Sequence, residues 1–285
     1  MQNWVLLIVI YAILNGIWAI FKKKALTKNA VMEVLATYSL LAFCLVAFEF
    51  PSAIQLDLKY ILFILLKSLV IFWSWFLGFY CIKKIPISLY GVLNLSRIIF
   101  STLWGIIFLH ESLKSSQLLG GFIIITGLVL VNIQATEEGK KQEAIKLKYI
   151  ILLLFSFILS TLSGLIDKII MKDILSGQLQ FWFMFFLAVM YWGYLLFART
   201  KVEFKKLVRN YWIALLAICL IIGDRALFIA NSIPESRLST MSLIKQLSAL
   251  VTIVIGGLVF KEKKLLYRFI CSIIVLIGIS IVILF

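Results

Sequence analysis

The chain has 285 residues and a formal net charge of +15; 63% of its residues are hydrophobic and only 14% are charged. Soluble domains are about 45 to 50% apolar and about 25% charged, so this composition excludes a water-soluble fold of the same length. A helix needs roughly 20 apolar residues to cross a bilayer, which leaves room for about ten such helices and for no folded soluble domain.

Hydropathy along the chain predicts an all-α integral membrane protein with ten transmembrane helices. The predicted spans are residues 4–21, 31–48, 60–82, 86–109, 116–134, 148–171, 178–198, 211–231, 235–260 and 265–284. No proline interrupts a span. Pro51, Pro86 and Pro234 lie in a loop or in the first turn of a span, where the missing amide proton removes no helical hydrogen bond.

Basic residues are concentrated in the loops that follow the odd-numbered spans, beginning with Lys22, Lys23 and Lys24. The opposite loops contain only Lys59, Lys114, Lys172 and Arg237. Because positively charged loops stay in the cytoplasm, we expect a multi-pass protein of the cell membrane, in contact with lipid, with both termini extracytoplasmic. The same bias accounts for the positive charge, and a nucleic-acid partner is not expected because no basic run accompanies a recognition fold.

The two halves of the chain repeat one pattern at an offset of about 150 residues. Gly105, Glu111 and Gly127 recur as Gly256, Glu262 and Gly278, and Pro86 recurs as Pro234. We therefore predict a first five-helix repeat in residues 1–134, a linker loop in residues 135–147 and a second five-helix repeat in residues 148–285. An odd number of crossings inverts the second repeat relative to the first, which is the plan of many secondary transporters.

Short motifs close each predicted repeat. The stretch Pro86–Asn132 contains Phe108-Leu109-His110-Glu111, then Leu119-Gly120-Gly121 and Thr126-Gly127, and an echo runs from Pro234 through Phe260-Lys261-Glu262 to Gly278. The pattern resembles the EamA repeat of the drug/metabolite transporter superfamily over nearly the whole chain. The resemblance implies ten helices, two inverted repeats around a central cavity, and a capping or gating role for Glu111 and Glu262. Bacterial relatives are often placed with both termini cytoplasmic, whereas the basic residues here predict the reverse.

Ionisable residues also lie inside the predicted spans, where each would cost roughly 2.5 to 3.5 kcal/mol if it faced lipid at the bilayer centre. They are the basic Lys67, Arg97, Lys168, Arg225 and Lys245 and the acidic Asp167 and Asp224. We expect them to face water, one another or a ligand. For Lys168 and Asp167, near the end of a span, an interfacial position is the alternative, with Lys168 snorkelling to the headgroups. Asp224 and Arg225 point about 100° apart, so they cannot neutralise each other on one face, and a structural ion pair with another helix is the alternative role for each.

Polar residues repeat every three or four positions in several spans, and each set forms one stripe along a helix face. The stripes are Tyr90, Asn94, Arg97, Ser101 and Trp104; Met241, Lys245, Ser248 and Thr252; Ser156, Ser160, Ser163 and Asp167; Lys67, Ile71, Ser74 and Gly78; and Tyr11, Asn15 and Trp18. We expect the stripes to converge on one wet cavity, with a substrate between the fourth and ninth spans.

These features favour a non-enzymatic, secondary-active transporter of a small polar, anionic solute, such as a phosphorylated or carboxylated metabolite or a lipid headgroup. Arginine can hold a phosphate or carboxylate with two parallel hydrogen bonds. The predicted substrate-binding residues are Arg97, Lys245, Asn94, Ser101, Tyr90, Ser248, Thr252, Lys67 and Trp18, and the predicted coupling or ion-pair residues are Asp224, Arg225 and Asp167. No cofactor or metal is expected, and a monomer or a homodimer is possible.

Two other functions stay open. An aromatic-lined cavity could export cationic or zwitterionic amines, with Trp18, Trp73, Trp75, Trp104, Trp182, Trp192, Tyr11, Tyr90 and Tyr191 as candidate wall residues. A membrane scaffold without transport activity is the other. Gly223-Asp224 with Asp167 is reminiscent of intramembrane aspartyl proteases, but their flanking motifs are missing, and the single histidine, His110, gives no zinc site.

Overall fold

The computed structural model describes residues 3–27, 29–84, 90, 93–94, 96–139, 147–199, 210–259 and 265–284, and every regular element in that part of the chain is helical. The all-α class predicted from composition is therefore confirmed. Before the linker region the helices are α1 (Asn3–Ala25), α2 (Val31–Val46), η1 (Ala47–Glu49), α3 (Phe50–Ala53), α4 (Leu58–Lys84), α6 (Ser96–Leu109) and α7 (Ser115–Gly139). After it they are α8 (Leu147–Ile170), α9 (Ser176–Phe197), α11 (Tyr211–Ser232), α12 (Leu238–Ile244), α13 (Leu247–Val259) and α14 (Leu265–Leu284).

Within the described residues, 7 segments are long and apolar enough to cross a membrane. They are Asn3–Ala25, Val31–Ala53, Leu58–Lys84, Leu147–Ile170, Ser176–Phe197, Tyr211–Ser232 and Leu238–Gly256. Shorter apolar helices, Ser96–Leu109, Ser115–Gly127 and Ile273–Val282, fall in the other three predicted spans. The chain is a multi-pass membrane protein, and the count of ten spans remains a prediction.

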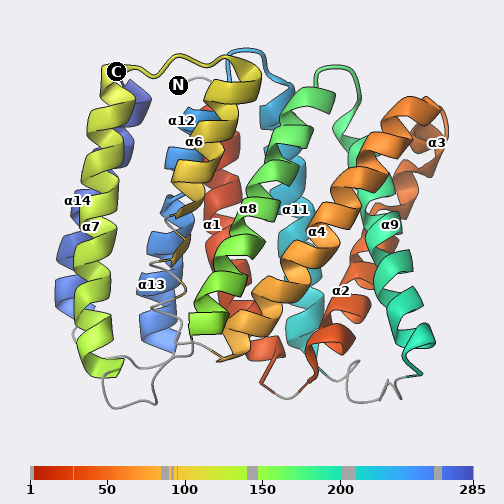
Figure 1. Cartoon of the computed structure of the whole chain (residues 1–285), viewed down its shortest axis with the longest axis horizontal. Coiled ribbons are helices and arrows are strands. Elements are labelled where there is room, and N and C mark those ends of the chain that lie inside the picture. The colour runs from red at the N-terminus through yellow and green to blue at the C-terminus, as the bar shows by residue number, and fades with distance from the viewer. Residues whose placement is uncertain are drawn as a thin grey trace.

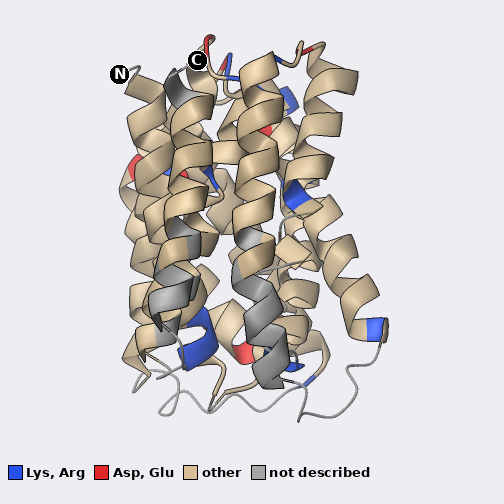
Figure 2. Ribbon diagram, turned by 90° about the vertical axis from the view of Figure 1, so that its left-hand side faces the viewer, with Lys and Arg blue, Asp and Glu red and all other residues tan. Residues whose placement is uncertain are grey.

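The helices form one upright bundle in which both labelled termini lie at the same end (Figure 1). Helix α1 packs along α11, α4 along α8, α2 along α9 and α7 along α14. We call the end that holds the termini the terminus end, and the end where α1 and α4 finish the loop end. Figure 2 shows mostly neutral ribbon between the two ends, with a few charged positions part-way along the helices.

Helices α7 and α14 approach closely enough that only glycine fits at the contact. A Cβ atom at Gly120 would lie 2.8 Å from the carbonyl oxygen of Gly278, and one at Gly278 would lie 2.9 Å from that of Gly120. Small residues allow helix backbones to pack closely in a membrane, where lipid provides no hydrophobic drive for association. Gly278, the repeat counterpart of Gly127, thus packs α14 against Gly120 of α7.

The predicted ninth span is broken into α12 and α13, which is a correction to the continuous helix expected for residues 235–260. At the break, Gln246 N–H bonds to Leu243 O at 3.1 Å and Ser248 N–H to Lys245 O at 3.0 Å. The Gln246 side-chain amide also donates to Ser242 O at 3.1 Å. Irregular backbone at membrane depth is tolerated where it lines a cavity, and Lys245, which caps α12, lies on a cavity wall.

Candidate functional site

A cavity of about 190 Å³ lies among α1, α4, α6, α8, α11, α12 and α13. The structure brings most of the predicted polar stripes to its wall. The predicted site residues that line it are Tyr11, Asn15, Trp18, Lys67, Tyr90, Asn94, Arg97, Ser101, Asp167, Asp224, Lys245, Ser248 and Thr252. Met241 does not: its side chain is fully buried in an apolar cluster.

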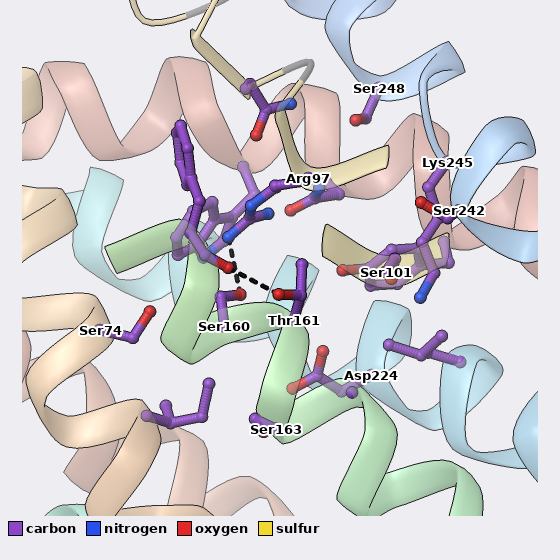
Figure 3. Close-up of a pocket in the computed structure, with 18 of the residues that line it drawn as sticks. Ser74, Arg97, Ser101, Ser160, Thr161, Ser163, Asp224, Ser242, Lys245 and Ser248 are labelled. Carbon is purple, nitrogen blue, oxygen red and sulfur yellow. Dashed lines mark hydrogen bonds between the residues drawn. The ribbon is translucent and has the colours of Figure 1, made fainter. Parts of the chain in front are cut away.

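Arg97, near the start of α6, lies on the cavity wall (Figure 3). One terminal nitrogen donates to Ser160 Oγ of α8 at 2.7 Å, and the guanidinium carbon lies 4.8 Å from the centroid of the Phe157 ring. The Nε atom is buried and has no hydrogen-bond partner among the described residues. Arg97 is therefore held by α8 on one side and keeps a free donor.

Lys67 and Asp167 form a buried ion pair between α4 and α8, with 2.6 Å between the ammonium nitrogen and a carboxylate oxygen. The two residues are 1% and 4% exposed. The Lys67 ammonium also lies 3.8 Å from the centroid of the Phe183 ring and 4.3 Å from that of Phe228. The interfacial position considered for Asp167 is thus wrong: its carboxylate is buried because Lys67 on the neighbouring helix neutralises it.

Asp224 of α11 and Lys245 at the α12–α13 break complete the charged wall of the cavity (Figure 3). Asp224 forms neither an ion pair nor a hydrogen bond with any described residue. The Lys245 ammonium lies 5.4 Å from the Tyr11 ring centroid. On the described wall, Lys67, Arg97 and Lys245 thus face Asp167 and Asp224. The excess of basic side chains is smaller than the spans taken together suggest.

Among the predicted substrate-binding and coupling residues, Arg225 is the one that does not line the cavity. Its guanidinium bonds to Glu49 Oε1 at 2.7 Å and to Gln180 Oε1 at 2.7 Å. These two interactions join α11 to η1 and to α9. This arrangement follows from the adjacent Asp224, which takes the cavity-facing side of the same helix.

Lys168 does not snorkel to the headgroups, and the structure corrects that expectation. Its ammonium donates to Asn231 O at 3.0 Å, Ile233 O at 3.1 Å and Ser236 Oγ at 2.5 Å. The residue is 5% exposed. Its positive charge therefore meets the free carbonyl groups at the C-terminus of α11, where the helix dipole favours a cation.

Glu111 caps a helix of the other half of the chain. Its carboxylate accepts hydrogen bonds from Leu238 N–H at 2.5 Å, Ser239 N–H at 3.0 Å and Ser239 Oγ at 2.6 Å, at the N-terminus of α12. A Cβ atom at Gly105 would lie 2.8 Å from this carboxylate, so a larger residue there would displace the carboxylate from its position at α12. Glu262, its predicted counterpart, lies outside the described residues.

The candidate aromatic residues divide into two groups. Trp18, Trp75, Tyr11 and Tyr90 line the cavity. The others hold helices together: Trp182 donates to Ala53 O, Trp192 to Ala36 O, Tyr191 to Phe72 O and Trp104 to Thr161 Oγ1, whereas Trp73 is half exposed. Only part of the proposed aromatic wall therefore faces the site.

The sequence reading missed Lys22, which it assigned to a cytoplasmic loop. Lys22 is only 3% exposed and lies in the last turn of α1. One signal was available: Trp18 and Lys22 are four residues apart, so they share a helix face.

Comparison with known proteins supports a membrane transporter. Residues 2–133 match the family model described as the EamA-like transporter family, which confirms the resemblance read from the motifs of the first half. A crystal structure of another protein aligns over 99% of this chain and 96% of that chain, with a TM-score of 0.75 and 12% sequence identity; at this identity the likeness shows a shared fold alone. No curated protein matches the sequence.

Proposed function

From the match of residues 2–133 to the EamA-like transporter family, we propose that the protein is a secondary transporter that moves a small polar, anionic metabolite by alternating access. The observation that supports an anion most directly is Arg97, a guanidinium on the cavity wall whose buried Nε has no hydrogen-bond partner among the described residues. Phosphate and carboxylate groups supply the paired acceptor oxygens that such a donor fork binds.

The packing between the two halves supports two inverted repeats. In the predicted correspondence, α1 matches α8, α4 matches α11, α2 matches α9 and α7 matches α14. Exchanging the halves turns the α1–α11 contact into the α8–α4 contact, and both contacts exist. The same exchange leaves the α2–α9 and α7–α14 contacts unchanged. Many carriers use this symmetry to present one site alternately to the two sides of the membrane.

In this proposal the solute lies between α6 and the α12–α13 break. Arg97 binds its anionic group, Lys245 adds a second positive charge, and Asn94, Ser101 and Ser248 supply hydrogen bonds from the same wall. Lys67 contributes less than the sequence suggests, because Asp167 neutralises it. Thr252 donates to Gly16 O at 3.1 Å and to Ser248 O at 2.8 Å, so its hydroxyl mainly positions α1 against α13.

A zwitterionic solute is the second candidate, and Asp224 is the observation that favours it. The carboxylate of Asp224 lines the cavity without a partner among the described residues, so it is free to accept an ammonium group. In the anion transporter, the same carboxylate is the candidate proton carrier, whereas Asp167 is already paired with Lys67. The proposal keeps both termini on the extracytoplasmic side in either case.

The test compares wild type with Arg97→Gln in a thermal-shift screen and in transport by proteoliposomes. Phosphorylated or carboxylated compounds are expected to raise the Tm of the wild type, because a ligand that binds only the folded state stabilises it, and to leave Arg97→Gln unchanged. Lys172→Gln, an exposed basic residue, is the matched control and should behave as wild type. Anion uptake that survives Arg97→Gln, or stabilisation of the wild type by quaternary amines alone, contradicts the proposal.

A further inference from the structure

Lys22 is a buried ammonium group whose neighbours are aromatic rings. Its nitrogen lies 4.0 Å from the centroid of the Phe79 ring, 4.8 Å from Trp18 and 5.7 Å from Tyr90. It forms no ion pair and no hydrogen bond with the described residues. A cation held over several ring faces in a desolvated position is the arrangement by which proteins bind alkylammonium ligands.

The rings are held in place independently of the lysine. Trp18 and Phe79 meet edge to face, with centroids 5.7 Å apart and planes at 76°. Behind them, Phe79 stacks on Tyr38 at 6.1 Å, and Tyr90 meets Phe157 at 5.6 Å. These ring contacts do not involve Lys22, so they hold the three rings in place independently of it.

The nearby Ser156 hydroxyl is already engaged in hydrogen bonds with Ser74 and does not pair with the ammonium. Ser156 Oγ donates to Ser74 O at 2.7 Å, and Ser74 Oγ donates back to Ser156 O at 2.8 Å. A Cβ atom at Gly78 would lie 3.9 Å from the lysine nitrogen and 3.1 Å from Ser156 Oγ, so a side chain there would crowd Ser156 beside the lysine. The aromatic faces are thus the principal contacts of the charge in the described structure.

We propose that Trp18, Phe79 and Tyr90 form an alkylammonium-binding cage that the chain fills with its own Lys22. Trp18 and Tyr90 also line the central cavity, so the cage and the cavity share a wall. This role rests on the proposed function. A filled cage contributes to charge selectivity because a free amine cannot reach the occupied aromatic faces. An anion bound at Arg97 also has the positive charge of Lys22 behind the shared wall.

The experiment empties the cage and refills it with the group that was removed. Lys22→Ala removes the side chain, and n-butylammonium replaces it. We expect n-butylammonium chloride to raise the Tm of purified Lys22→Ala by about 2 °C or more, and to leave the wild type unchanged because its cage is full. Sodium chloride at the same concentration and n-butanol control for ionic strength and for the alkyl chain. Lys84→Ala, an exposed lysine at the same end, controls for the lost charge and should not respond.

Two further variants make the result specific. Lys22→Ala with Phe79→Leu lacks the nearest ring and should lose the response, whereas Lys22→Met fills the cage without a charge and should never show it. The proposal is overturned if folded Lys22→Ala does not respond, if wild type responds equally, or if the Phe79→Leu double variant still responds. None of these measurements requires an anionic solute. A failed anion screen on the wild type would contradict the proposed function but not the cage. A failed n-butylammonium response would contradict the cage but not the proposed function.

Discussion

The two ends of the bundle stabilise buried charge in different ways. At the terminus end, Lys168 meets the oxygens at the end of α11 and Glu111 meets the amide groups at the start of α12. At the loop end, Lys22 meets only ring faces in the described structure. A buried charge in this protein can thus be stabilised by directional hydrogen bonds, which also hold a helix end in position. It can also be stabilised by non-directional contacts with aromatic rings, which do not position the backbone.

Further hydrogen bonds join the two halves of the chain at the terminus end. Arg237 donates to Ser112 O at 2.9 Å, and the Gln117 amide donates to Thr240 Oγ1. Together with Glu111 these bonds tie α12 to the α6–α7 connection, across the two halves of the chain. We therefore expect the two ends to respond very differently when their charged residue is removed.

The largest effect is expected for Lys168→Met. The change leaves the buried carbonyl of Asn231 without its ammonium donor, whereas Ile233 O keeps the hydrogen bonds from Ser236. We expect a loss of about 3 kcal/mol, the cost of breaking one side of a buried charged network. Thermal unfolding in detergent, followed by intrinsic fluorescence, measures it. Lys172→Met, one turn further along and exposed, should leave the Tm unchanged; equal losses in both variants would show that Lys168 has no special role.

Glu111→Gln should have an intermediate effect. The neutral amide keeps one acceptor oxygen but loses the charge that faces the N-terminus of α12, and we expect a cost of about 1.5 to 3 kcal/mol, as for hydrogen bonds to charged groups. A cysteine introduced by Ser239→Cys can be alkylated, and its alkylation rate is compared with and without Glu111→Gln. A faster rate in the double variant shows that the N-terminus of α12 has become more accessible. An unchanged alkylation rate would mean that the cap stabilises α12 without closing this end.

Lys22→Met should have the smallest effect, within about 1 kcal/mol of the wild type. The cation–π attraction, about 2 kcal/mol when desolvated, is offset by the desolvation of an ammonium that has no oxygen partner, and an apolar residue of similar size often replaces a buried charge at no cost. The same thermal assay measures the change. A loss as large as that of Lys168→Met would erase the difference between the two ends.

Periodicity predicted the cavity wall well and the partners of the charges poorly. Arg97 and Ser101 share a helix face because they are four residues apart, and both reach the cavity. The pairing of Lys67 with Asp167 depends instead on α4 lying beside α8. No local pattern encodes that adjacency, and the break at Lys245 and Gln246 has no proline or glycine to announce it.

The amino-acid sequence alone determined that this protein is helical, membrane-embedded and polar along particular faces, because hydrophobicity and the helical repeat act over neighbouring residues. Only the tertiary structure decided which charges remain available to a solute. Arg225 is unavailable because it pairs with Glu49, and Lys168 is unavailable because it donates to carbonyl groups at the end of α11. Electrostatic pairing depends on distances of a few ångströms between segments far apart in the chain, and those distances are fixed only when the helices pack.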